Sequence, residues 1–60
     1  MKLKEIMKHI PVYQYFRLEE NLSIVAGGYT KSADIQKYEN KTIGSIRIQS
    51  GTLTISVYSR

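Results

Sequence analysis

The feature that most constrains the fold is a hydrophobic alternation on either side of Ser50-Gly51. The alternating apolar residues are Ile46, Ile48, Leu53, Ile55 and Val57. A period of two is typical of strands with one buried face, and a two-residue turn ending in glycine closes a hairpin. The resulting register pairs Ile48 with Leu53, Ile46 with Ile55 and Gly44 with Val57. The opposite side is polar and consists of Ser45, Arg47, Gln49, Thr52, Thr54 and Ser56.

A second hairpin is predicted upstream, where the pattern takes a period of two from Val12 onward. Its first strand alternates between one side with Val12, Gln14, Phe16 and Leu18 and another with Tyr13, Tyr15 and Arg17. A three-residue loop, Glu19-Glu20-Asn21, then places Leu18 opposite Leu22 and Phe16 opposite Ile24. A two-residue loop would set Leu18 opposite Ser23 and mismatch the faces, so we predict the three-residue loop.

Two short helices are predicted, one before each hairpin. The first is indicated by the i, i+3, i+4, i+7 spacing of Leu3, Ile6, Met7 and Ile10, and Pro11 ends it. The second covers residues 30–40. Ser32 is its N-cap, Asp34 lies in its first turn, and Ile35 and Tyr38 share a face.

The order of elements is therefore αββαββ. It predicts one small α+β domain over residues 1–60, with two short helices on one face of a four-stranded, mainly antiparallel sheet. A chain of 60 residues buries only about 60% of its unfolded surface. Because four strands leave two sheet edges that invite pairing, and a second copy would enlarge a small core, we expect a homo-oligomer.

The sequence points to the cytoplasm and away from the membrane. Lysines, Glu5 and His9 interrupt every candidate signal-peptide core near the N-terminus. The longest uncharged run, residues 48–59, is well short of the ~20 residues of a membrane span. The absence of cysteine agrees with a cytoplasmic location.

No residue pattern supports catalysis or a metal site. The chain has no cysteine, and its single histidine, His9, has no positioned partner and no further ligands around it. Glu19 and Glu20 are predicted to be solvated at a hairpin tip, whereas acid–base pairs need carboxylates in different environments. The glycine-containing segment 27–32 lacks both phosphate-loop spacings. We therefore expect a non-enzymatic protein without catalytic residues, metal or cofactor.

The tyrosine content directs attention to one sheet face. The candidate interface residues are Tyr13, Tyr15, Arg17 and Val25. Such a face is too apolar to be left to solvent and suits a protein interface, foremost with another copy of the chain.

Nucleic acid is the alternative partner, because the formal net charge is +4 and tyrosines can stack on bases. The candidate phosphate contacts are Lys31, Lys37, Lys41 and Arg47. These cations are not clustered with the tyrosines in the sequence, so a protein interface is preferred. The sequence does not distinguish DNA from RNA.

The chain resembles very small accessory proteins encoded by phages and prophages of Gram-positive bacteria. The resemblance rests on the opening run 1–6, the strand followed by the acidic turn 19–21, the Asp34-Ile35 pair and the closing hairpin at Ser50-Gly51. It implies a viral protein in the host cytoplasm, of a kind that includes anti-CRISPR and other counter-defence inhibitors. Such proteins bind a host effector, its nucleic acid or a signalling molecule. The resemblance carries no catalytic motif.

Overall fold

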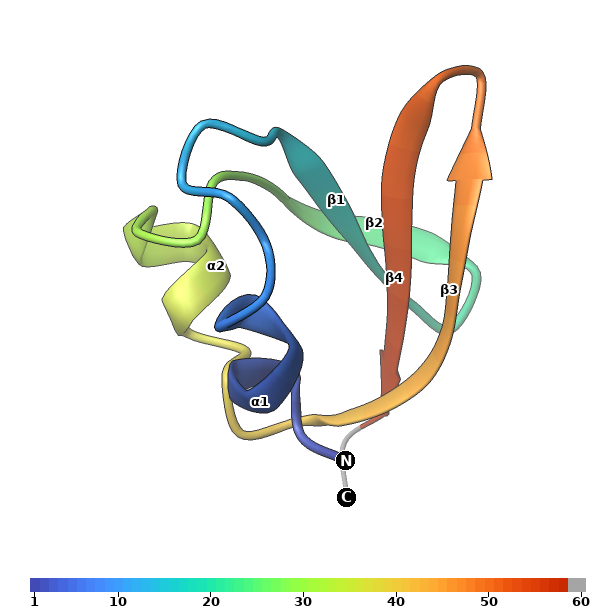
Figure 1. Cartoon of the computed structure of the whole chain (residues 1–60). Helices are drawn as coiled ribbons and strands as arrows, with labels where there is room; N and C mark the ends of the chain where they lie inside the picture. Colours follow the sequence, from blue (N-terminus) through green and yellow to red (C-terminus); the bar gives the residue numbers. More distant parts are fainter. Residues whose placement is uncertain (59–60) are drawn as a thin grey trace.

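The computed structural model describes residues 1–58, and its elements follow the predicted order. They are α1 (Leu3–Met7), β1 (Phe16–Glu20), β2 (Ser23–Gly28), α2 (Ala33–Gln36), β3 (Thr42–Gln49) and β4 (Thr52–Tyr58). Both helices lie on the same side of one four-stranded sheet (Figure 1). The α+β class and the αββαββ order are thereby confirmed.

The sheet joins two hairpins through their inner strands. Its strand order is β2-β1-β4-β3; the pairs β1–β2 and β3–β4 are antiparallel, whereas β1 and β4 run parallel. The predicted "mainly antiparallel" sheet is thus a mixed one with a single parallel pairing. This order leaves β2 and β3 at the two edges.

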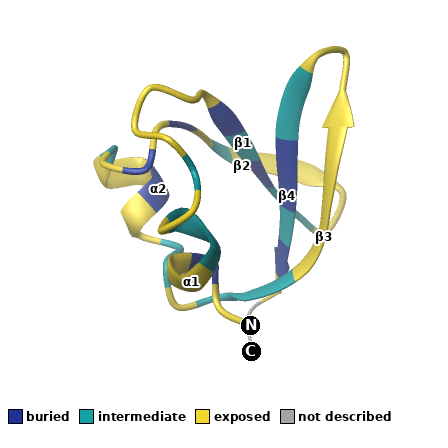
Figure 2. Ribbon diagram, viewed as in Figure 1, coloured by how far each residue is buried: buried dark blue, intermediate teal, exposed yellow. Residues whose placement is uncertain are grey.

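A small core lies between the helices and the two central strands. Its buried hydrophobic side chains are Leu3, Phe16, Leu18, Ile35, Ile55 and Val57. The helices contribute Leu3 and Ile35, and β1 and β4 contribute the other four. The burial-coloured view shows these segments facing one another, while β3 is largely exposed (Figure 2). Ile6, Met7 and Ile10 pack against this core, as their helical spacing predicts.

The short first helix is held in place by its backbone. The Leu3 amide donates to the Lys41 carbonyl at 2.9 Å, and the Ile43 amide donates to the Met1 carbonyl at 2.8 Å. The Glu5 carboxylate accepts a 2.7 Å hydrogen bond from the Lys2 amide at the helix start. These contacts fix a helix too short to be stable alone against the segment leading into β3.

The second helix is shorter than predicted. It covers only Ala33–Gln36 and continues as turns up to residue 40, with the Tyr38 amide donating to the Ile35 carbonyl at 3.0 Å. Ser32 is the N-cap residue, as expected, but its hydroxyl accepts the Tyr29 amide (2.9 Å) and caps no helix amide. The predicted burial of Ile35 is confirmed.

The first strand begins later than predicted, at Phe16 instead of Val12. The preceding segment is a turn in which the Gln14 amide donates to the Pro11 carbonyl at 3.0 Å. The Gln14 side chain also donates to the Tyr15 carbonyl at 2.8 Å. Because this segment forms a turn, the alternation from Val12 to Tyr15 is not used in the sheet.

The predicted three-residue loop of the first hairpin is wrong. Glu20 pairs with Ser23, so the loop consists of Asn21 and Leu22, whose φ angles are 55° and 65°. Two consecutive positive φ angles are typical of a type I′ turn, which matches strand twist. A β-bulge after the pair Glu19–Ile24 leaves Val25 without a partner, so Leu18 pairs with Ala26.

The second hairpin follows the prediction near its turn and departs from it further away. Ile48 pairs with Leu53 and Ile46 with Ile55, as expected. Gly44 does not pair with Val57, because Gly44 is the extra residue of a bulge and Ile43 takes its place. A Cβ on Gly44 would lie 2.8 Å from Cζ of Tyr58, so only glycine leaves room for that ring at the bulge.

Burial along this hairpin differs from the simple division into one apolar and one polar side. Ile46 and Ile48 lie on the core side but are 46% and 74% exposed, because the hairpin extends beyond the helices (Figure 2). Thr54, predicted to be on the polar side, is fully buried. It lies between Arg17 and Arg47 in the register, and long arginine side chains on both sides cover it.

Candidate interaction surface on the open sheet face

The face of the sheet opposite the helices, the open face, is where the chain presents its polar and aromatic groups. Strand alternation places there the residues that flank the buried Phe16 and Leu18 and their partners in the register. We define the open face by Tyr15, Arg17, Glu19, Ile24, Ser45, Arg47, Thr54 and Ser56. The pairing of β1 with β4 brings residues distant in sequence side by side on it.

Glu19 organises one part of the open face. Its carboxylate accepts hydrogen bonds from Nη2 of Arg47 (2.5 Å) and from the Ser56 hydroxyl (2.9 Å). Arg47 Nη1 also donates to the Ser56 hydroxyl at 3.4 Å. The hydrogen bond from Arg47, and secondly that from Ser56, lowers the pKa of Glu19 below its ordinary value of 4.5. The network joins β1, β4 and β3 across the sheet.

The lowered pKa of Glu19 predicts an acid-dependent part of the stability. A carboxylate with a depressed folded-state pKa contributes stability above its unfolded pKa and loses it as pH falls through the folded pKa. We expect Glu19→Gln to have a lower free energy of unfolding than the wild type near pH 7. As the pH falls below 4.5, the free energy of unfolding is expected to decrease less in the variant than in the wild type. Urea unfolding at a series of pH values measures this.

Glu5 limits how much of the acid dependence Glu19→Gln can remove. The Lys2 amide, with smaller contributions from nearby positive charges, also lowers the pKa of Glu5, so some acid dependence persists in the variant. Glu39→Gln is the matched control, because it also removes one carboxylate but keeps both Glu5 and Glu19 with their hydrogen bonds. If the free energy of unfolding falls equally steeply with decreasing pH in the wild type and in Glu19→Gln, the network around Glu19 does not have this role.

Arg17 differs from Arg47 in lacking an acidic partner. It lies on β1, between Gly27 on one side and Thr54 on the other. Within residues 1–58 no carboxylate forms an ion pair with it, and its Nε is buried without a hydrogen-bond acceptor. A guanidinium is a strong donor of paired hydrogen bonds to carboxylates. The middle of the open face therefore carries a cationic side chain without an acidic partner among residues 1–58.

One tyrosine lies next to Arg17 and contacts a second. A Cβ on Gly27 would lie 2.6 Å from the Tyr15 hydroxyl oxygen, so this glycine makes room for Tyr15, and the same position is 3.7 Å from Cγ of Arg17. Tyr15 and Tyr29 meet edge to face, with ring centroids 5.8 Å apart, and each is 44% exposed. Sequence reasoning did not assign Tyr29 to this face, because the contact depends on the chain turning after β2.

The four predicted interface residues are not all brought together. Tyr15 and Arg17 share the open face, as expected. Tyr13 is 80% exposed but lies in the turn before β1, outside the sheet. Val25 is the unpaired bulge residue of β2, so it has no partner on β1, and Gly27 is the residue opposite Arg17. The predicted exposure of Tyr13 and Tyr15 is confirmed. The prediction that both lie in one strand is wrong, because β1 begins only at Phe16.

The four candidate phosphate contacts do not form one basic surface. Three of them pair with carboxylates: Lys37 with Asp34 (3.7 Å), Lys41 with Glu20 (3.3 Å) and Arg47 with Glu19 (2.5 Å). Lys41 also lies 5.7 Å from the centroid of the Tyr38 ring. Lys31 is exposed in the loop before α2. Lys37 and Lys41 follow α2, whereas Arg47 lies on the open face, so the set is divided between separate regions.

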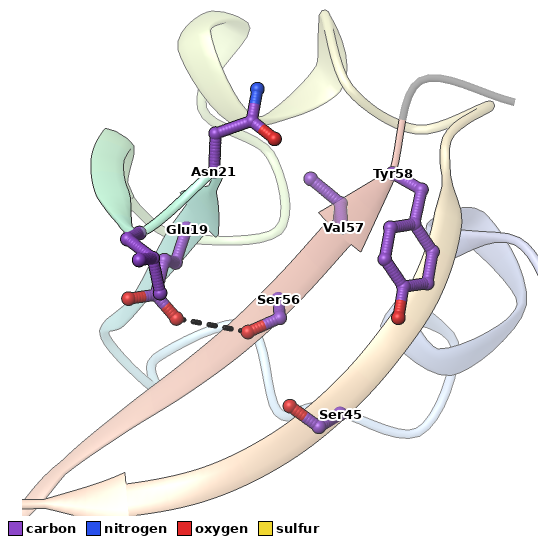
Figure 3. Close-up of a pocket in the computed structure, with 7 residues that line it drawn as sticks. Glu19, Asn21, Ser45, Ser56, Val57 and Tyr58 are labelled. Carbon is purple, nitrogen blue, oxygen red and sulfur yellow. Dashed lines mark hydrogen bonds between the residues drawn. The ribbon is translucent and has the colours of Figure 1, made fainter.

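A hollow of about 260 Å³ lies at one end of the open face. Its lining residues are Glu19, Asn21, Leu22, Ser45, Ser56, Val57 and Tyr58. Figure 3 shows the Ser56 hydroxyl directed at the Glu19 carboxylate, with Tyr58 and Ser45 beside them. His9 directly follows α1, and α1 lies on the other side of the sheet from the open face (Figure 1).

Residues 1–58 contain no group of three or more histidine, aspartate or glutamate side chains placed to hold a metal ion. None of the helices in this part of the chain is both long enough and apolar enough to cross a membrane.

Comparison with known proteins gives no relative for this chain. No protein-family model, curated protein or solved structure matches it. Its function has to be inferred from the surfaces described above.

Proposed function

We propose that this chain is a non-enzymatic, self-associating interaction protein that binds an acidic surface of a host protein through its open face. On the resemblance described above, it is encoded by a phage or prophage and acts in the host cytoplasm. Its target is then a host defence factor, which binding inhibits. The support for binding comes from the open face, and the support for the setting comes from the resemblance.

The observation that carries the proposal is the contrast between two arginines on the same face. Arg47 is satisfied by Glu19 within the chain, whereas Arg17 has no carboxylate partner among residues 1–58. A half-buried arginine next to a half-exposed tyrosine has the composition of an interface hot spot. A carboxylate from a partner would satisfy the charge that the chain itself leaves unpaired.

A protein partner fits this surface better than nucleic acid. Phosphate-dominated binding needs several unpaired cations along one path. Three of the four candidate cations already have carboxylate neighbours within the chain, and Lys31 lies apart from them. Nucleic acid therefore stands as the alternative that the experiment below must separate.

Removing the charge of Arg17 is expected to weaken partner binding. We expect Arg17→Gln to reduce affinity about tenfold to thirtyfold, because removal of a charged hot-spot group costs about 1.5–2 kcal/mol. The measurement captures host proteins from a Gram-positive lysate on immobilised wild type and variant, followed by titration of the captured protein. Tyr15→Ala is expected to weaken the same interaction.

Lys31→Gln is the matched control, because it also removes one positive charge but from an exposed loop away from the sheet. It is expected to bind the protein partner like the wild type. DNA and RNA probes are tested in parallel by fluorescence anisotropy at low salt. The proposal fails if Arg17→Gln binds the captured protein normally, or if the chain binds nucleic acid with steep salt dependence that Lys31→Gln weakens.

A further inference from the structure

The β3 edge of the sheet has an uncovered stretch of backbone. The start of β3 is covered by the N-terminal segment, through the Lys2–Thr42 bridge and the hydrogen bond from the Ile43 amide to the Met1 carbonyl. No other described element pairs with β3 on the side away from β4. Residues 45–49 therefore form an open edge, beginning just after the bulge at Gly44.

The register fixes which backbone groups face outward along this stretch. In a hairpin with a two-residue turn, the pair next to the turn, Gln49 with Thr52, exchanges hydrogen bonds, and hydrogen-bonded pairs then alternate along the ladder. Arg47 is in the next such pair, so its amide and carbonyl face β4. The N–H and C=O groups of Ile46 and Ile48 consequently point away from the sheet.

The same two residues also present apolar side chains. Ile46 and Ile48 are 46% and 74% exposed on the helix side of the sheet, where the hairpin extends past the helices (Figure 2). Exposed edges in soluble proteins are usually protected by lysine, proline or a bulge. Residues 45–49 contain no lysine or proline, and their one charge, Arg47, is paired with Glu19.

The opposite edge is less suited to pairing. β2 has its bulge at Val25, in the middle of a six-residue strand, and it ends in Gly27 and Gly28. A bulge bends and twists a strand, which interrupts pairing with a straight neighbour. The bulge of β3 lies near its start and leaves the stretch 45–49 regular.

We infer that a second copy of the chain pairs antiparallel with the β3 edge, about a two-fold axis beside Arg47. This register uses the whole uncovered stretch of both copies and places each Ile46 opposite Ile48 of the second copy. The four isoleucines form one apolar row on the helix side. Like charges directly opposite are unfavourable, but here each arginine is neutralised by its own Glu19.

A second copy is the occupant favoured by the symmetry of this stretch. A strand that pairs with itself about a two-fold axis needs no other complementary surface, and the pairing closes after two copies. The inference rests on the self-association in the proposed function and specifies its surface. It leaves the open face, with Arg17, free for the other partner.

Light scattering after size-exclusion chromatography tests this surface. We expect the wild type to reach twice the chain mass of 6.9 kDa as its concentration rises from about 10 µM to about 1 mM. Ile48→Lys places a charge at an exposed edge position and is expected to raise the dimer dissociation constant about tenfold or more. Ile24→Lys, at an exposed isoleucine of β2, is the matched control and is expected to dimerise like the wild type.

A cysteine variant tests the register independently, since the chain has no cysteine of its own. Facing residues in a non-hydrogen-bonded antiparallel pair have Cα atoms about 4.5 Å apart, which suits a disulfide. Arg47→Cys is expected to form a disulfide-linked dimer under mild oxidation, whereas Ser23→Cys on β2 is expected not to. Neither variant depends on Arg17.

The outcomes separate this inference from the proposed function. A monomeric wild type at about 1 mM, or an unchanged dimer in Ile48→Lys, overturns the β3 pairing. Cross-linking through Ser23→Cys overturns it in favour of the β2 edge, and growth into larger assemblies overturns it in favour of a head-to-tail contact that does not close. If Arg17→Gln loses host-protein binding but still dimerises, both the β3 pairing and the binding role of the open face are supported. If that variant binds the host protein normally, only the binding role of the open face is rejected.

Discussion

Phe16→Ala is expected to leave the chain unfolded at 25 °C. Phe16 is fully buried on the central strand β1 and is the largest of the buried side chains. Truncating a buried phenylalanine costs about 3–5 kcal/mol, because it removes apolar contacts and leaves a cavity. A core of this size seldom supplies more than about 3–5 kcal/mol in total. Far-UV circular dichroism and a proton NMR spectrum measure the loss of structure.

Tyr13→Ala is the control for this expectation, because it removes an aromatic ring that is 80% exposed and outside the sheet. Its free energy of unfolding is expected to stay within about 0.5 kcal/mol of the wild type. A cooperatively folded Phe16→Ala with a free energy of unfolding close to that of the wild type would show that the described core is not the one that stabilises the chain.

Leu22→Gly is expected to stabilise the chain. Leu22 has a φ of 65° and is 93% exposed, so it adopts a left-handed conformation without gaining any packing in return. That conformation costs a non-glycine residue about 1–2 kcal/mol, and Asn-Gly is the preferred type I′ sequence. After allowing for the greater flexibility of glycine in the unfolded chain, we expect a net gain of about 0.5–1 kcal/mol.

The corresponding rise in melting temperature is about 2–8 °C, because 1 kcal/mol shifts a domain of this size by about 4–8 °C. Thermal unfolding of wild type, Leu22→Gly and Leu22→Ala measures it. Leu22→Ala keeps the unfavourable φ and is expected to show no such rise. If Leu22 instead lay in the strand opposite Leu18, Leu22→Gly would lower the melting temperature.

The first hairpin shows why a correct residue pattern led to an incorrect loop. Matching the faces of Leu18 and its partner excluded a two-residue loop that sets Leu18 opposite Ser23, but the observed loop, Asn21-Leu22, begins one residue later and was not considered. The chain satisfies the same criterion by adding one residue at Val25. An Asn-Leu turn lacks the glycine that would have indicated a type I′ turn, so no local signal pointed to it.

The second hairpin contained a usable signal for its own bulge. Ile43 did not fit the alternation that joined Ile46 to Ile48, and an apolar residue out of phase next to a glycine indicates an inserted residue. In the structure Gly44 is that residue, and Ile43 returns to the core opposite Val57. The sequence alone did not show that the Tyr58 ring occupies the space beside Gly44.

The candidate site was predictable only in part. That Tyr15 and Arg17 share an exposed face was predicted from the alternation, although β1 begins only at Phe16. The partners of Glu19, by contrast, come from β3 and β4, because β1 lies parallel to β4. The positions of the charged residues in the sequence did not show that Arg47 forms an ion pair and Arg17 does not, because the ion pair joins two strands that are far apart in the chain.

By itself, the sequence determined the element types, their order and the apolar positions that form the core, because period and turn chemistry act over a few neighbouring residues. Only the tertiary structure decided how the two hairpins join, where each bulge falls and which of the two sheet edges stays regular. These features depend on contacts between residues far apart in the chain, such as Glu19 with Arg47 and Met1 with Ile43. No local pattern encodes such contacts, since their free energy arises only once the strands have met.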